Sequence, residues 1–115
     1  MKLKFRAWDR KTKSMILEVW EIGFGDRNNP ETWLVGDDRQ TNNFDLMQFT
    51  GLLDKNGKEI YEGDLIKTPD NRILPVIFKE GCFGFENNLE NKQFAYFTKA
   101  LTTAIEVVGN IYKIK

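Results

Sequence analysis

Apolar and polar residues alternate over the first positions of the chain. One face of this extended segment is apolar and the other is mostly basic, with Leu3, Phe5 and Ala7 on the first face and Lys2, Lys4, Arg6 and Trp8 on the second. A period of two is typical of a half-buried β-strand. Apolar character returns over residues 15–20, so we predict that the two runs pair as a hairpin.

Turn-forming residues divide the rest of the chain into further short strands. Asn56-Gly57 favours a tight hairpin turn, because the central positions of such a turn need positive φ angles. Pro75 cannot donate a ladder hydrogen bond, so its strand lies at an edge or is bulged there. Polar loops are predicted at residues 23–30 and 36–43. The further predicted strands cover residues 32–35, 46–50, 59–61, 64–68, 72–79, 82–86 and 105–112.

Residues 89–103 fit two kinds of secondary structure. Phe94 and Phe97 have a helical spacing, whereas Phe94, Tyr96 and Thr98 also fit a strand. We favour a strand followed by a short helical turn.

The spacing of strands and turns predicts a mainly β fold, or at most a β-rich α+β fold. In this prediction about eight short antiparallel strands form a barrel-like or strongly bent sheet. The stretch from Gly63 to Lys67 is similar to the opening of SH3-like or OB-like barrels, so an SH3-like small barrel is one option for the C-terminal half, by analogy of fold alone. The length of 115 residues predicts a single domain, residues 1–115.

Composition and charge exclude several classes of protein. Apolar residues make up 41% of the chain and charged residues 30%, which is ordinary for a globular protein. Lysine plus arginine and aspartate plus glutamate each number 17, so the chain lacks the overall positive field of a dedicated duplex DNA binder. No apolar run approaches the roughly 20 residues needed to cross a bilayer, and we expect a cytoplasmic protein.

The residue types also limit the chemistry. The chain has no histidine and a single cysteine, so we predict no catalytic triad, no zinc or iron site and no disulfide. Asp54 to Gly57 reads as a turn and not as a calcium loop, and the nearby Glu59, Glu62 and Asp64 read as turn residues. Cys82 is predicted to be a small buried thiol. We therefore predict no catalytic residue, metal or cofactor, and no enzymatic activity.

Two clusters of basic and aromatic residues could bind a ligand. The first is the polar face of the opening strand, formed by Lys2, Lys4, Arg6 and Trp8, which could hold a phosphate backbone or a single-stranded base. The alternative is a solvated strand protected from aggregation by its lysines. The second cluster is formed by Lys92, Phe94, Tyr96, Phe97 and Lys99. Here core packing is the favoured interpretation, because a small domain leaves few aromatic clusters exposed.

Three stretches of the chain, in this order, resemble the YopX family. They are KFRAWD at residues 4–9, MQFTGL at 47–52 running into DKNGKEIYEGD at 54–64, and VGNIY at 108–112. The resemblance implies a mainly β protein of bacteriophages and prophages, located in the bacterial host cell, without an established activity or catalytic residues to carry over. The family commonly continues after Asn-Ile-Tyr into an Asn-Pro-Glu-Leu type tail, where this chain has Lys113-Ile114-Lys115.

Two functions follow as hypotheses. The preferred one is a non-enzymatic accessory protein that binds a protein partner or itself, because the charge is balanced and because Trp20 and Trp33 flank a polar loop. The alternative is a small β-barrel that binds nucleic acid through Lys4, Arg6 and Trp8.

Overall fold

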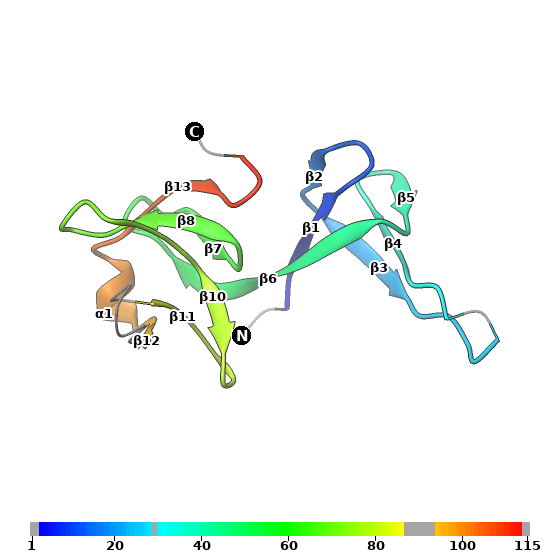
Figure 1. Ribbon diagram of the computed structural model, residues 1–115. Helices are drawn as coiled ribbons and strands as arrows, with labels where there is room; N and C mark the ends of the chain where they lie inside the picture. Colours follow the sequence, from blue (N-terminus) through cyan, green and yellow to red (C-terminus); the bar gives the residue numbers. More distant parts are fainter. Residues whose placement is uncertain (1–2, 29, 87–93, 114–115) are drawn as a thin grey trace. The chain divides into compact units, whose positions relative to one another are not determined.

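The computed structural model describes residues 3–28, 30–86 and 94–113, and it is built mainly of short antiparallel strands (Figure 1). The described residues form thirteen strands and one short helix. The elements are β1 (Phe5–Asp9), β2 (Ser14–Ile16), β3 (Val19–Gly23), β4 (Trp33–Gly36), β5 (Arg39–Thr41), β6 (Phe44–Leu53), β7 (Glu59–Tyr61), β8 (Asp64–Lys67), β9 (Ile73–Pro75), β10 (Ile77–Lys79), β11 (Cys82–Glu86), β12 (Phe94–Tyr96), α1 (Lys99–Thr102) and β13 (Glu106–Asn110). The predicted mainly β class is confirmed, with one of the four sheets strongly curled into a half-barrel.

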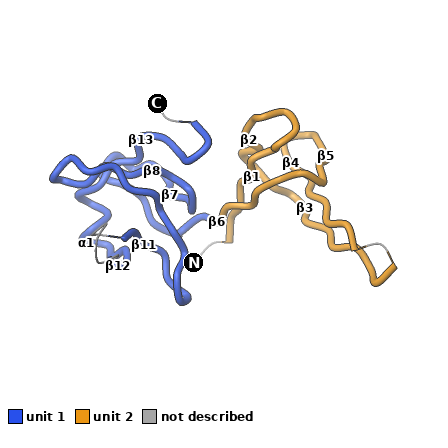
Figure 2. The backbone as a smooth tube through the Cα atoms, viewed as in Figure 1, with its two compact units in different colours: residues 1, 49–115 blue, residues 2–48 orange. Residues whose placement is uncertain are grey.

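Contacts divide the chain into two compact units, shown in Figure 2. The N-terminal unit comprises the described residues up to Gln48, and the C-terminal unit begins at Phe49. Strand β6 contributes to both units, because its first half pairs with β1 and its second half pairs with β7. The single domain stays a prediction, since a division by contacts does not say whether either unit folds alone.

The N-terminal unit has a small core, to which β1, β2 and β4 each contribute one buried side chain. Ala7, Ile16 and Leu34 are buried together, and Val19, Ile22 and Phe44 pack against them. The predicted first hairpin is confirmed, since Ala7 pairs with Ile16 across β1 and β2. Leu3, predicted on the apolar face, is 67% exposed instead, because it precedes β1 and has no strand partner in the sheet.

The predicted polar loop at residues 36–43 is wrong, because it contains strand β5. Gly36 pairs with Arg39, so only Asp37 and Asp38 connect β4 to β5. Both aspartates have positive φ angles, 49° and 61°, which is the conformation of a two-residue type I′ hairpin turn. Asparagine and glycine are the usual residues of this turn, so the Asp37-Asp38 pair gave no recognisable signal for it in the sequence.

The C-terminal unit contains the larger core. The buried core residues are Ile60, Ile66, Leu74, Val76, Phe85, Ile105 and Val107. Strand β8 lies between β13 and β9, and β11 lies between β10 and β12. Between β9 and β10, the Val76 N–H donates to the Asp64 carbonyl at 2.8 Å and the Val76 carbonyl accepts from Gly63 at 3.0 Å. Val76 therefore remains hydrogen-bonded to Gly63 and Asp64 at the start of β8, and the next residue, Ile77, begins the pairing of β10 with β11.

Two predicted turns of the C-terminal unit form at the predicted places, but the Asn56-Gly57 turn is not of the predicted reversed type, because Asn56 does not have a positive φ. Asp54 Oδ1 accepts hydrogen bonds from the backbone N–H groups of Asn56 and Lys58, both at 2.9 Å, and Gly57 has a φ of 80°. Asp54 Oδ2 also accepts from Val107 at 2.8 Å, which fixes the β6–β7 turn to β13. Asp64 is buried and accepts from the Tyr61 N–H at 2.7 Å.

The ambiguous segment holds a strand and then a helical turn, as favoured from the sequence. Strand β12 ends at Tyr96, and α1 begins after Thr98, whose side chain accepts from the Leu101 N–H at 3.1 Å as an N-cap. Residues 89–93 of that prediction lie outside the described residues. In the part of the chain that the structure describes, no helix has the length and apolar character needed to cross a membrane.

Candidate functional site

The predicted basic face of the first strand is only partly open to solvent. Lys4, Arg6 and Trp8 are half-buried, and Lys2 lies outside the described residues. Arg10, beyond the strand, forms an exposed ion pair with Asp45 at 2.5 Å. Arg6 and Trp8 lie on β1 and Lys4 directly precedes it, and the role of these residues in binding stays a prediction.

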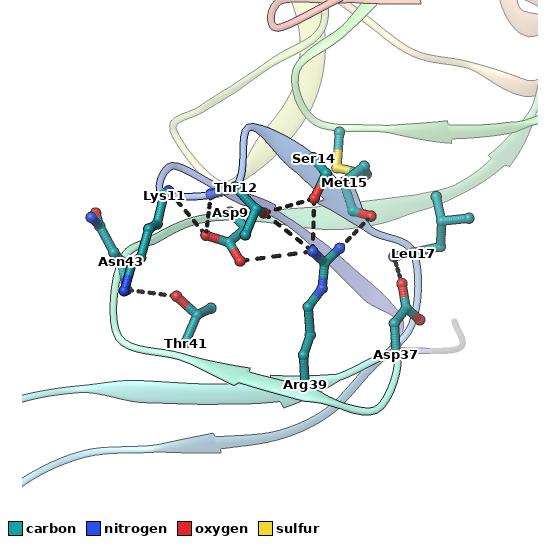
Figure 3. A network of polar contacts seen from close by, with 10 residues as sticks. All are labelled: Asp9, Lys11, Thr12, Ser14, Met15, Leu17, Asp37, Arg39, Thr41 and Asn43. Atoms are coloured by element: carbon teal, nitrogen blue, oxygen red, sulfur yellow. Dashed lines mark hydrogen bonds and ion pairs between the residues drawn. The ribbon is translucent and has the colours of Figure 1, made fainter.

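A polar network pins the hairpin beside this face (Figure 3). Asp9 is buried and accepts hydrogen bonds from the N–H groups of Lys11 and Thr12, at 3.0 and 3.3 Å. Arg39 Nη1 lies 3.8 Å from Asp9 Oδ2 and donates to Ser14 at 2.7 Å, while Nη2 donates to the Met15 carbonyl at 2.9 Å. Arg39 thus joins β5 to the β1–β2 hairpin.

The charge of Asp9 is maintained inside this network. Burial is the largest single influence and raises the pKa of the carboxyl, but the hydrogen bonds from Thr12 and Lys11 and the charge of Arg39 together outweigh it. The net pKa lies below the ordinary value of 3.8. The Asp9 carboxylate and the Arg39 guanidinium are both engaged by groups of the same unit, so their role is structural. Sequence reasoning missed Arg39, because a single arginine in a predicted loop carries no pattern.

The strongest candidate surface is the outer face of the C-terminal unit. Along residues 73–77, exposure alternates, with Leu74 and Val76 buried and Ile73 56% exposed. The next strands continue this face, since Ile77 pairs with Gly84 and Gly84 pairs with Tyr96, which is 64% exposed. We define the outer face by Ile73, Pro75, Ile77, Phe94 and Tyr96.

Glycine at position 84 shapes the aromatic half of this face. A Cβ atom at Gly84 would lie 2.7 Å from Cζ of Phe94, so the Phe94 ring lies across the glycine. The rings of Phe94 and Tyr96 meet edge to face at 5.7 Å, and Lys79 Nζ lies 6.0 Å from the Phe94 ring centre. Phe97, in contrast, packs into the core against Phe85 at 5.8 Å.

The second predicted cluster therefore divides between core and surface. Core packing is right for Phe97 and wrong for Tyr96, because β12 ends at Tyr96 with its side chain on the outer face. Lys92 lies outside the described residues, and Lys99 is exposed at the start of α1. The prediction of a buried Cys82 is also wrong: the thiol is exposed, because Cys82 follows the tight Glu80-Gly81 turn at the end of the sheet.

A small cavity opens at one end of the outer face. Its volume is about 230 Å³, and its lining residues are Leu74, Pro75, Ile77 and Glu86. A second, more open cavity of about 400 Å³ lies in the N-terminal unit, with the lining residues Lys11, Glu31, Trp33, Gln40, Thr41 and Asn42. The second cavity is bordered mostly by exposed polar chains, so the first has the more defined chemistry.

The described residues contain no group of three or more aspartate, glutamate, histidine or cysteine side chains placed to hold a metal ion. The acidic residues singled out from the sequence include Asp64, whose carboxylate is engaged by the Tyr61 N–H of its own turn. The absence of enzymatic activity stays a prediction.

Comparison with known proteins places the chain in a family. The family model for the YopX protein matches residues 4–114. Among solved structures, the chain is similar to protein EF1440 from Enterococcus faecalis, with a TM-score of 0.73 and 24% identity over 97% of this chain and 94% of that one. It is also similar to yopX from Bacillus subtilis, with a TM-score of 0.55 and 21% identity over 95% of this chain and 92% of that one.

At these identities the two solved structures establish the fold alone. No match was found among curated proteins. The resemblance noted in the three sequence stretches is confirmed, because the family model covers nearly the whole sequence. The chain belongs to the YopX family.

Proposed function

We propose that this YopX family protein is a non-enzymatic accessory protein of a phage or prophage, and that it binds another protein through the outer face of its C-terminal unit. The observation that carries the proposal is the exposure of Ile73 on β9 and of Tyr96 on β12, in two sheets of the C-terminal unit, together with half-buried Ile77 and Phe94. Contiguous apolar surface of this kind is typical of interaction sites. Aromatic side chains are also enriched at the centres of protein interfaces.

The charges around this face favour a protein over a nucleic acid. Lys79 lies beside the Phe94 ring, but Glu86 borders the same face and Glu80 lies in the adjoining turn. Binding to a phosphate backbone requires several cations whose counterions are released, and acids among them oppose it. A mixed rim around an apolar centre is the ordinary composition of a protein interface.

Nucleic-acid binding is the second candidate, on a different surface. It rests on Lys4, Arg6 and Trp8, which β1 and the residue before it bring close together. This hypothesis predicts binding that weakens steeply with salt and on Lys4→Ala or Arg6→Ala.

The test is affinity purification of the tagged protein from its bacterial host, with and without nuclease. Three variants are compared with the original chain: Ile73→Glu, Tyr96→Glu and the control Leu53→Glu. Leu53 is 50% exposed and also in the C-terminal unit, but it lies at the end of β6 and outside the outer face. We expect a protein that co-purifies with the original chain and the Leu53 variant, and is lost from the other two.

Other outcomes identify other functions. A companion lost after nuclease treatment, and insensitive to Tyr96→Glu, would support the nucleic-acid hypothesis. A companion retained by all three variants would contradict the proposed face. Recovery of the untagged chain alone, with the same dependence on Tyr96 and Ile73, would show that the partner is a second copy.

A further inference from the structure

The cavity beside Pro75 lies where the pairing between β10 and β11 stops. Ile77 pairs with Gly84, and continuing this antiparallel register by two residues on each strand would place Pro75 opposite Glu86. The observed pairing between β10 and β11 stops at Ile77 and Gly84. Proline has no N–H to donate, so the ladder cannot continue, and the cavity lies at this interruption.

The geometry of β11 directs a backbone carbonyl to the same place. The Phe83 carbonyl accepts from the Phe97 N–H at 3.0 Å, so it points toward the β12 side of the strand. Backbone polar groups alternate in direction along a strand, so those of Gly84 and Glu86 point toward the β9–β10 side. Glu86 therefore presents its carbonyl to a position where proline offers no donor.

The walls of the cavity are apolar except for one acidic side chain. Leu74, Pro75 and Ile77 supply the apolar surface, and Glu86 supplies a carboxylate. No ion pair joins Glu86 to another residue within the described ranges 3–28, 30–86 and 94–113. The volume of about 230 Å³ is below the roughly 300–1,000 Å³ typical of sites for whole small molecules. It suits one side chain.

We infer that this cavity accepts one apolar side chain of a protein partner, and that Glu86 binds an arginine or lysine next to that side chain. The inference rests on the proposed function, because it names the feature of the partner that the outer face recognises. Two acceptors at the rim, the Glu86 carboxylate and the Glu86 carbonyl, select a cationic donor. The apolar walls select the neighbouring aliphatic residue.

The test uses short peptides as probes on the full chain. The protein labelled with ¹⁵N is titrated with N-acetyl-leucyl-arginine amide, N-acetyl-leucyl-glutamine amide and N-acetyl-glycyl-arginine amide, with NMR detection at Val76, Ile77 and Glu86. We expect saturable shifts with the leucyl-arginine probe, and an affinity about threefold to tenfold above that of each of the other two.

Two variants separate the charge from the cavity. Glu86→Gln removes the carboxylate, so it should bind the leucyl-arginine and leucyl-glutamine probes with equal affinity. Pro75→Val restores an N–H opposite Glu86 and lets the ladder close, so it should bind none of the probes while keeping a folded spectrum. Absence of saturable shifts at the three residues, or equal affinity of the original chain for all probes, would overturn the inference.

The two proposals fail separately. If a partner depends on Ile73 and Tyr96 but the probes do not bind, the outer face stands and the side-chain pocket is wrong. If the probes bind with the expected preference but no partner depends on the outer face, the proposed function is wrong and the pocket remains.

Discussion

The N-terminal unit and the C-terminal unit are each stabilised internally by a different set of interactions. The buried core cluster of the N-terminal unit holds three apolar side chains, one of them an alanine, and the Asp9–Arg39 network ties the hairpins of this unit together. The buried core cluster of the C-terminal unit holds seven apolar side chains, all of them larger than alanine. Its buried aspartates, Asp54 and Asp64, accept backbone hydrogen bonds.

The difference shows how a small β unit compensates for a small core. Burial of apolar surface contributes about 25 cal/mol per Å², so a core of Ala7, Ile16 and Leu34 stabilises its sheets only modestly. An internally satisfied polar network adds geometric definition, because each donor and acceptor has one arrangement that satisfies it.

The largest effect should come from the apolar core of the C-terminal unit. Ile66 is completely buried between β13 and β9, so Ile66→Ala should lower the free energy of unfolding by about 2–5 kcal/mol. The measurement is denaturant unfolding followed by circular dichroism, with amide hydrogen exchange of β8 and β13 as the local readout. Ile73→Ala is the matched control on the exposed side of the neighbouring strand, and should change stability by less than about 0.5 kcal/mol. Equal losses for both variants would contradict the assignment of inner and outer faces.

The chain itself offers a way to observe each unit. All three tryptophans, Trp8, Trp20 and Trp33, lie in the N-terminal unit, and all three tyrosines lie in the C-terminal unit. Tryptophan fluorescence therefore reports on the N-terminal unit. If Ile66→Ala shifts the tryptophan transition as far as it shifts the exchange of β8, the two units unfold together and the predicted single domain is correct.

The second effect concerns the polar network of the N-terminal unit. Arg39→Leu removes the partner of buried Asp9 and the donor to Ser14 and Met15, so it should cost about 2 kcal/mol. Tryptophan fluorescence during denaturant unfolding measures this loss. The control is Arg10→Gln, which breaks the exposed ion pair with Asp45 and should cost less than about 1 kcal/mol. A loss for Arg10→Gln as large as that for Arg39→Leu would remove the distinction between buried and exposed pairs.

Local patterns were sufficient to predict the strands and turns that follow common chemistry. The alternation around Ala7, the Asn56-Gly57 turn and the interruption at Pro75 all come from rules that act over a few residues. The structure has more strands than the pattern predicts. Residues 72–79 form two strands separated by Val76, and the Asp37-Asp38 turn leads into a strand where the sequence predicts a loop.

The candidate site depended on relations that the sequence does not contain. Phe94 and Gly84 are ten positions apart, and only the β11–β12 register brings the ring over the glycine. Tyr96 and Phe97 are adjacent aromatic residues, and consecutive side chains of an extended chain point to opposite faces. This alternation places Tyr96 at the surface and Phe97 against the core. The cavity required knowledge that Glu86 and Pro75, eleven positions apart, would line the same space.

The smallest effect should come from acid, and it tests whether the carboxylate of Asp9 itself supports the N-terminal unit. Its pKa in the folded protein lies below 3.8, so the stabilisation by the carboxylate is fully present above that value and is lost as the pH falls through the folded pKa. The original chain and Asp9→Asn are compared by tryptophan-detected unfolding from about pH 6 to about pH 2. We expect their difference in unfolding free energy to shrink below pH 3.8.

The remaining question is which part of the network lowers the pKa of Asp9. The N–H groups of Thr12 and Lys11 are stronger influences than the charge of Arg39, so Arg39→Leu should keep most of the pH dependence although it loses stability. A pH dependence that disappears in Arg39→Leu would show that the ion pair at 3.8 Å dominates. Identical pH profiles of the original chain and Asp9→Asn would contradict the lowered pKa of Asp9, because a carboxyl with the same pKa in the folded and unfolded states adds no pH dependence to stability. The N-terminal unit would then depend on its hydrogen bonds alone, and the contrast with the C-terminal unit would reduce to core size.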